Sequence, residues 1–149
     1  MLRKKRRILT KGQCHCFRRS AGSKVTIKAV RWVTTIQHGG NVDQPGTFQA
    51  DRIAEFDAFA FGCSAQGDEV LEEDEFEPMF AGCAEKLSGK PVALFSSYGW
   101  GDGQWMRDWE ARCADAGIHL CANSVICNEA PDTDVAEACK ALGAFLAKA

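Results

Sequence analysis

The stretch from Tyr98 to Gly103 carries the residues with the clearest binding chemistry in this sequence. Trp100 stands between Gly99 and Gly101. Glycines let the backbone adopt positive φ angles and approach a bound group closely. A large flat ring in such a loop suits stacking on another planar system, because ligands of open α/β sheets bind at the carboxyl ends of strands. The pattern also allows a plain turn whose tryptophan packs into the core.

That loop joins an expected strand to an expected helix. The apolar run Val92–Tyr98 follows Pro91 and is typical of a buried strand of a parallel sheet. After the loop, Trp105, Trp109 and Cys113 recur at helical spacing and predict the inner face of a helix that ends before residue 117. We therefore expect these two tryptophans to lie in the core.

The alternation of strand and helix extends on both sides of this loop. Residues 50–56 predict a short helical or turn segment, and residues 57–63 predict a strand that ends in a loop of small and polar residues, 64–69. A helix with an acidic start follows, then a broken strand pattern over 118–127 and a last helix. The inner faces of these two helices carry Met79, Phe80, Cys83 and Leu87, and Val135, Cys139, Leu142 and Leu146. This order predicts an α/β fold, a parallel sheet covered by helices.

Charge divides the chain into two parts near residue 45. Residues 1–42 hold eleven of the 18 Lys and Arg residues and no acid, whereas residues 43–149 hold all 20 acids. We expect a basic N-terminal segment, 1–47, and a separate domain, 48–149. The basic run at residues 3–7 is typical of a solvated tail, with a nucleic-acid patch as the alternative. Residues 24–30 alternate like a strand, and residues 39–46 predict a turn.

The eight cysteines indicate reduced, buried thiols, because no Cys-x-x-Cys pair occurs and most of the later cysteines lie in apolar patterns. Such thiols favour a cytoplasmic location. Cys14 and Cys16 flank His15, but two ligands this close without a second pair are a weak zinc signal, so we expect no metal. No apolar run is long enough to span a membrane.

Three motifs together resemble those of the short-chain bacterial flavodoxins. They are GCSAQGDEVLEE at 62–73, VALFSSYGWGDGQWMRD at 92–108 and NEAPD at 128–132, and the resemblance runs from about Phe48 to the C-terminus. It implies a three-layer, doubly wound parallel sheet of five strands. It also implies a low-potential one-electron carrier with non-covalently bound FMN, a monomer that exchanges electrons with redox partner proteins through an acidic face around the flavin and is not an enzyme.

The resemblance also implies roles for individual residues. Trp100 would stack on one face of the flavin, and the loop at Gln66 and Gly67, where the family usually carries Met at position 66, would cover the other. The peptide after Gly67 would turn over to hydrogen-bond flavin N5, Glu69 would accept from N3–H, and Ser64 would reach the phosphate. The implied FMN-binding residues are Ser64, Ala65, Gln66, Gly67, Asp68, Glu69, Ser97, Tyr98, Gly99, Trp100 and Gly101.

The first 47 residues depart from the family pattern. Flavodoxins begin with an apolar strand that runs into a Ser-x-Thr-Gly-Asn-Thr loop, which binds phosphate at a helix N-terminus. Residues 1–47 contain no such motif. We therefore expect the first strand and the phosphate loop to be missing, the strand at 57–63 to border an open edge, and residues 25–30 to be the candidate that covers it. Our hypothesis is that this third of the chain is a frameshifted reading of a flavodoxin gene, with weakened FMN binding.

Two other functions fit parts of the sequence. A flavodoxin-like, FMN-dependent NAD(P)H reductase would use the same loops, but the chain shows no nicotinamide fingerprint and no extra substrate domain. Nucleic-acid binding through the basic N-terminus would leave both flavin-like loops without a role. The sequence favours the electron carrier.

Overall fold

The computed structural model describes residues 6–11, 41–43 and 45–148. Its strands alternate with helices after residue 57, as the sequence predicts. The elements in chain order are β1 (Arg6–Lys11), β2 (Asn41–Asp43), η2 (Pro45–Thr47), η3 (Ala50–Glu55), β3 (Ala58–Cys63), α2 (Phe76–Ala84), η4 (Glu85–Leu87), β4 (Pro91–Tyr98), α3 (Gln104–Asp115), β5 (His119–Leu120), β6 (Val125–Asn128) and α4 (Thr133–Lys148).

All described strand pairs of the sheet are parallel, and the order is β2-β1-β3-β4, with β5 and β6 both on the outer side of β4. The short β5 pairs with Pro91 and Val92, and β6 pairs with residues 95–98 of the same strand. These two strands therefore share the fifth position of the sheet. The broken pattern predicted over 118–127 is this interrupted strand, and the doubly wound parallel sheet is confirmed.

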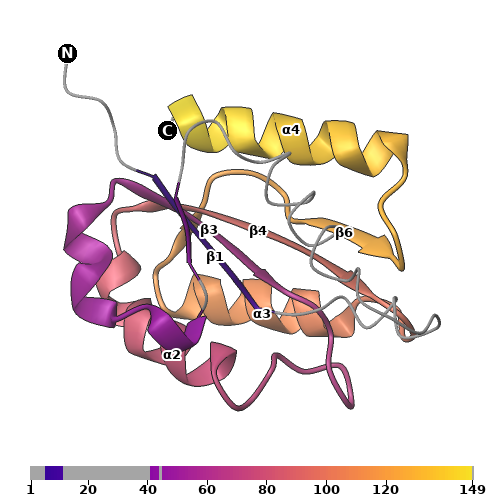
Figure 1. Cartoon of the computed structure of the whole chain (residues 1–149), viewed down its shortest axis with the longest axis horizontal. Coiled ribbons are helices and arrows are strands. Elements are labelled where there is room, and N and C mark those ends of the chain that lie inside the picture. The colour runs from indigo at the N-terminus through magenta and orange to yellow at the C-terminus, as the bar shows by residue number, and fades with distance from the viewer. Residues whose placement is uncertain (1–5, 12–40, 44, 149) are drawn as a thin grey trace.

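The expectation of a missing first strand is wrong. β1 pairs along its full length with β3, from Arg6 beside Ala58 to Lys11 beside Cys63, and β2 pairs with the other side of β1. β3 therefore lies inside the sheet instead of at an open edge (Figure 1). Sheet pairing uses backbone N–H and C=O groups, which every residue except proline supplies, so a basic strand can fill a position where an apolar one was expected.

Two smaller expectations for the N-terminal segment also need correction. Arg6 and Arg7 belong to a sheet strand, so the basic run is not wholly a solvated tail. Residues 41–43, expected as turn, form β2. The possible strand at 24–30 lies outside the described residues, as does the region after β1 where a phosphate loop would begin.

The described helices cover both faces of the sheet: α2 and α3 lie on one face and α4 on the other (Figure 1). β3 divides its side chains accordingly, since successive residues of a strand point to opposite faces. Phe59 and Phe61 join the core under α2 and α3, whereas Ala58 and Ala60 join the core under α4. Large rings on one face and small side chains on the other thus let helices pack on both faces.

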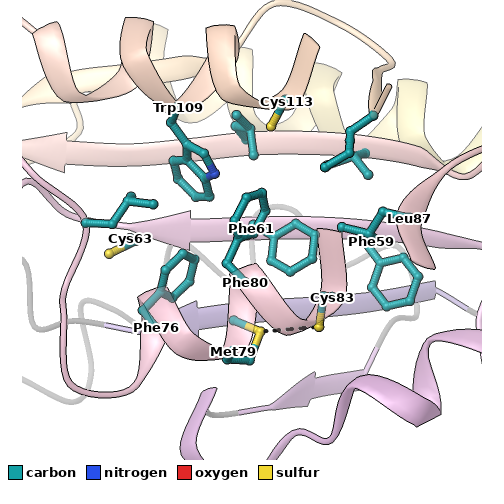
Figure 2. Close-up of a cluster of buried hydrophobic side chains, with 14 of the residues drawn as sticks. Phe59, Phe61, Cys63, Phe76, Met79, Phe80, Cys83, Leu87, Trp109 and Cys113 are labelled. Carbon is teal, nitrogen blue, oxygen red and sulfur yellow. Dashed lines mark hydrogen bonds between the residues drawn. The ribbon is translucent and has the colours of Figure 1, made fainter. Parts of the chain in front are cut away.

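The larger core is rich in aromatic rings (Figure 2). Phe80 lies between Phe61 and Trp109, with ring centroids 5.2 and 5.4 Å away, and both contacts are edge-to-face. Phe76 makes the same kind of contact with Trp109 at 5.4 Å. Edge-to-face packing places the positive ring edge on a negative ring face and adds to the gain from burial. The predicted inner faces of α2 and α3 are confirmed.

The predicted burial of the later thiols is confirmed in the described residues. Cys63, 83, 113, 127 and 139 are buried and unbridged, and Cys121 is partly buried. Burial raises the pKa of Cys83 and of Cys113 to about 11 and that of Cys139 to about 12, because a thiolate is costly in an apolar core. Cys14 and Cys16 lie outside the described residues. None of the described helices is long and apolar enough to cross a membrane.

Candidate functional site

Two loops meet at the carboxyl ends of the central strands β3 and β4. The 64–70 loop follows β3 and the 99–103 loop follows β4. The Ala65 N–H donates to the carbonyl of Ser97 at 3.3 Å, and the Trp105 indole N–H donates to the carbonyl of Cys63 at 3.2 Å. The first bond joins the start of the 64–70 loop to β4, and the second joins α3 to the end of β3, at the edge where open α/β sheets bind their ligands.

Trp100 is the most exposed large apolar side chain among the described residues, with 61% of its surface accessible. Trp105 and Trp109, only a few residues later, are each 2% exposed. The alternative in which Trp100 packs into the core is therefore wrong. An indole that is held at the ligand-binding edge and left open to solvent can stack on a planar partner.

The 64–70 loop is a tight hairpin. Gln66 and Val70 exchange two backbone hydrogen bonds, of 2.9 and 3.0 Å. Gly67 has a φ of 44°, and a Cβ added there would meet no atom within 4 Å. Position 67 therefore favours glycine for its backbone conformation and not for lack of space. Asp68, at the hairpin tip, is exposed.

Two polar side chains of this hairpin bond to each other. The side-chain amide of Gln66 donates to the hydroxyl of Ser64 at 3.1 Å, and Ser64 is only 4% exposed. Sequence reasoning treated Gln66 only as a replacement for methionine and missed this bond. The signal that could have found it is the spacing of two residues between a hydroxyl and an amide in a turn.

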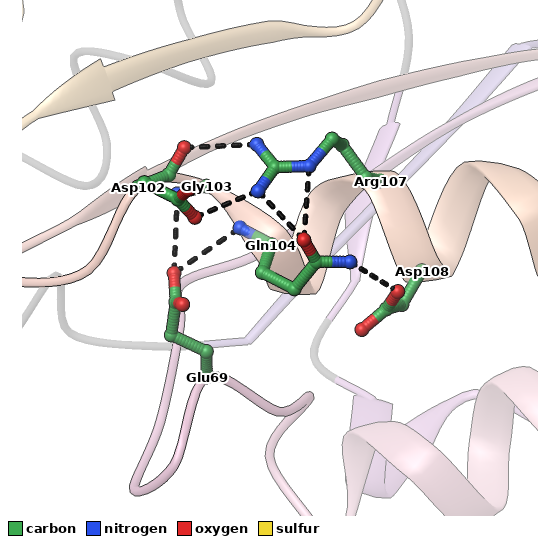
Figure 3. Close-up of polar contacts among 6 residues, drawn as sticks. All are labelled: Glu69, Asp102, Gly103, Gln104, Arg107 and Asp108. Carbon is green, nitrogen blue, oxygen red and sulfur yellow. Dashed lines mark hydrogen bonds and ion pairs between the residues drawn. The ribbon is translucent and has the colours of Figure 1, made fainter.

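Glu69 makes a contact that the sequence did not predict (Figure 3). One of its carboxylate oxygens accepts hydrogen bonds from the backbone N–H groups of Gly103, at 3.1 Å, and Gln104, at 3.2 Å. Glu69 thus caps the first turn of α3 from another loop, where a negative charge also complements the positive end of the helix. Glu69, which the family resemblance implies as the acceptor for flavin N3–H, thus links the 64–70 loop to the start of α3.

The third motif, 128–132, joins the same edge through Tyr98. The Tyr98 carbonyl accepts from the backbone N–H of Glu129 at 2.7 Å and from the side-chain amide of Asn128 at 3.4 Å. The Tyr98 ring packs against Trp105 with centroids 5.3 Å apart. Gly99, next in the chain, is exposed and would accept a Cβ without contact. All three sequence motifs therefore converge on one edge.

The convergent groups suit a flat, polar ring system better than a metal ion. An exposed indole lies on one loop, and the turn at Gly67, which bears no side chain, lies on the other. Ser64, Glu69 and the backbone of both loops supply donors and acceptors. Within the described ranges, no group of three His, Cys, Asp or Glu residues is placed to hold a metal ion.

Comparison with known proteins gives the same family as the motifs. The chain is 46% identical to the flavodoxin of Megasphaera elsdenii over 99 residues, which cover 66% of this chain and 70% of that protein. The chain belongs to the flavodoxin family. It is also 51% identical to the flavodoxin of Clostridium beijerinckii over 82 residues, 55% of this chain and 59% of that protein. No protein-family model matches the sequence.

Solved structures extend the similarity beyond the part matched by sequence. The solution structure of two-electron reduced M. elsdenii flavodoxin superimposes with a TM-score of 0.74 and 35% identity, covering 97% of this chain and 99% of that one. Oxidised flavodoxin 1 of Bacillus cereus, at 16% identity and a TM-score of 0.67, shares the fold. Flavodoxins are electron-transfer proteins rather than enzymes, their cofactor is FMN, and they interact with redox partner proteins.

Proposed function

We propose that this chain is a low-potential one-electron carrier that holds FMN non-covalently between the 64–70 and 99–103 loops. The observation that carries the proposal is the exposed indole of Trp100 at the ligand-binding edge of a flavodoxin fold. FMN, when bound, supplies the ring that takes up and releases the electron. The protein's part is to bind that ring, orient it and set the charge around it.

The proposed contacts follow the family roles. Trp100 would stack on one face of the ring, and Gln66 and Gly67 would cover the other. Glu69 would accept from the ring N3–H while it stays bound to α3. Ser64 would reach toward the phosphate, and the backbone of residues 98–101 would serve the pyrimidine end. The proposed FMN-binding set is Ser64, Ala65, Gln66, Gly67, Asp68, Glu69, Ser97, Tyr98, Gly99, Trp100 and Gly101.

Negative charge at this edge supports a low potential. Asp68, Glu69, Asp102 and Glu129 all lie in the loops that converge there. Carboxylates beside a flavin disfavour extra negative charge on the ring, so they lower the potential at which it accepts electrons. The same acids form the surface through which we propose that the monomer meets its redox partners in the cytoplasm.

The N-terminal segment limits the expected affinity. FMN carries a phosphate that flavodoxins bind mainly with backbone N–H groups of a loop after the first strand. β1 supplies a strand in that position, but the sequence that follows it has no Ser-x-Thr-Gly-Asn-Thr motif. We therefore propose that residues 1–47 are a frameshifted segment and that the chain binds FMN more weakly than flavodoxins with that loop.

Titration of the purified chain with FMN tests the function. Tryptophan fluorescence should be quenched with a stoichiometry of one, and a variant with the Ser-x-Thr-Gly-Asn-Thr motif introduced after β1 should bind more tightly. Absence of any flavin binding in both proteins would overturn the carrier. Oxidation of NAD(P)H by the FMN-loaded chain without a partner protein would favour the reductase, which the comparisons do not favour. Tight binding by the unaltered chain would overturn the frameshift hypothesis.

A further inference from the structure

We infer that Glu69 is a positioning residue that fastens the 64–70 loop to the start of α3, and that a side chain at position 101 would displace the Glu69 carboxylate, which occupies the space of a Cβ there. The contact itself stands on the described residues alone. Its consequence for the cofactor rests on the proposed function. We call this contact between Glu69 and residues 101–104 the loop clasp.

The carboxylate lies unusually close to the turn that precedes α3. A Cβ built on Gly101 would lie 2.3 Å from the carboxyl carbon of Glu69 and 2.3 and 2.8 Å from its two oxygens. Real Cβ atoms essentially never approach other heavy atoms within 3.0 Å. A side chain at position 101 must therefore move the Glu69 carboxylate, and we expect this movement to weaken its bonds to the N–H groups of Gly103 and Gln104. The empty space at Gly101 is what lets the carboxylate reach the helix.

The backbone on both sides is bent to form the clasp. Gly101 and Gly103 have φ angles of 86° and 88°, and Glu69 itself has a φ of 57°. Glu129 is the other residue besides glycine with positive φ in the described part of the chain. Such a conformation costs of order 1 kcal/mol in a residue with a Cβ, so surrounding contacts must hold it. The hairpin bonds at Gln66 and the two bonds to α3 provide those contacts.

The clasp sets the spacing between the two sides of the proposed flavin site. Trp100 belongs to one loop and Gly67 to the other. Glu69, two residues after Gly67, is bonded to Gly103, three residues after Trp100, and so joins the two loops. With the two loops joined before a ring binds, less ordering of the loops remains for binding to accomplish. A carboxylate can accept about four hydrogen bonds, so two bonds to α3 leave capacity for the ring N3–H.

Glycine variants with matched backbone strain test the clasp without any cofactor. Gly101→Ala introduces both a positive-φ alanine and the clash with Glu69, whereas Gly89→Ala introduces a similar φ of 77° with no atom within 4 Å. We expect Gly101→Ala and Glu69→Ala to speed amide hydrogen exchange at Gly103 and Gln104 by about fivefold or more, the effect of losing a helix cap. Gly89→Ala should leave these two amides unchanged. Glu69→Gln retains an acceptor oxygen and should restore most of the protection.

A double variant and an FMN titration complete the test. In a Glu69→Ala background, adding Gly101→Ala should cause little further exchange at Gly103 and Gln104, because the clashing carboxylate is gone. Unchanged exchange in both single variants, or equal effects of Gly101→Ala and Gly89→Ala, would overturn the clasp. If the clasp is confirmed, Gly101→Ala should weaken FMN binding about tenfold and Gly89→Ala should not. Failure of the unaltered chain to bind FMN would overturn the proposed function. The clasp would still be supported, because the hydrogen-exchange test uses no cofactor.

Discussion

Trp100 and the pair Trp105 and Trp109 lie within ten residues of one another, yet they have opposite surroundings. Trp100 is exposed and follows a glycine in an irregular turn, whereas the other two are buried on one face of α3. Residues four apart on a helix share a face, so the core side of α3 takes both rings. The difference teaches that the position of an indole in the glycine-rich turn or on the helix, and not the residue type, decides which indole is left exposed.

The buried pair is held by many contacts. Trp105 donates its indole N–H to the carbonyl of Cys63 and packs against Tyr98, and Trp109 packs edge-on against Phe76 and Phe80. Those contacts stabilise the fold. The exposed ring contributes little burial, so we expect its removal to affect binding and spare folding. The variants below test this division between stability and binding.

Trp109→Ala should have the largest effect, and it should fall on stability. Emptying a buried aromatic site typically lowers the free energy of unfolding by about 3–5 kcal/mol. Trp109→Phe should cost much less, because it keeps most of the ring and removes an indole N–H that is buried without a partner among the described residues. Urea unfolding of both variants measures the difference. Equal losses in the two variants would show that the ring contacts are not what stabilises this core.

Buried thiols should make the free energy of unfolding decrease at alkaline pH. Cys83, Cys113 and Cys139 have folded-state pKa values of about 11, 11 and 12, raised mainly by burial from the ordinary value of 9.0. Between pH 9 and these values the unfolded chain loses thiol protons that the folded chain keeps. Stability present below pH 9 is therefore lost as pH rises, by about 1 kcal/mol per thiol at pH 10.

Urea unfolding at pH 8 and pH 10, with a reductant present, measures this loss. Cys139→Ala should reduce the decrease between the two pH values by about one third, because it removes one of the three thiols with the largest pKa shifts. A decrease that Cys139→Ala leaves unchanged would show that other groups cause it.

Trp100→Ala should change binding instead of stability. Losing an aromatic stacking partner weakens binding of a planar ring by about 1–3 kcal/mol. The free energy of unfolding should change by less than about 0.5 kcal/mol, as for ordinary surface substitutions. Titration of FMN, followed by flavin absorbance, and urea unfolding of the same sample separate the two effects. Unchanged FMN affinity would remove Trp100 from the proposed site.

Much of the fold could be predicted because local patterns and tertiary burial agree after residue 48. The helical spacing of Trp105, Trp109 and Cys113 and the apolar run of β4 both fall on elements that the structure places in the core. The position of the candidate site followed from topology, since parallel strands gather their following loops at one edge. Family motifs then supplied the residue roles, which remain predictions until FMN binding is measured.

Prediction from the sequence failed where backbone hydrogen bonds, and not side-chain polarity, determine the structure. β1 has Arg6 and Lys11 at its ends, and this composition predicts a basic tail. Its backbone groups nevertheless pair with those of β3 in the sheet. The loop clasp was also missed, because a contact between Glu69 and Gly103 joins residues 34 positions apart and has no periodic signature. Both misses concern hydrogen bonds of the main chain, which one-dimensional patterns of polarity do not encode.

Gln66→Met should have the smallest effect and tests the loop opposite Trp100. Methionine gives up the bond from the Gln66 amide to Ser64, which should lower the free energy of unfolding by about 0.5–1.5 kcal/mol. It gains a polarizable thioether that can contact the flavin face, so we expect FMN binding to tighten by a few-fold. Gln66→Ala, which loses the bond and offers no thioether, is the matched control and should weaken binding instead. FMN titration of both variants decides the matter, since weaker binding in Gln66→Met would mean that the amide itself holds the site in shape.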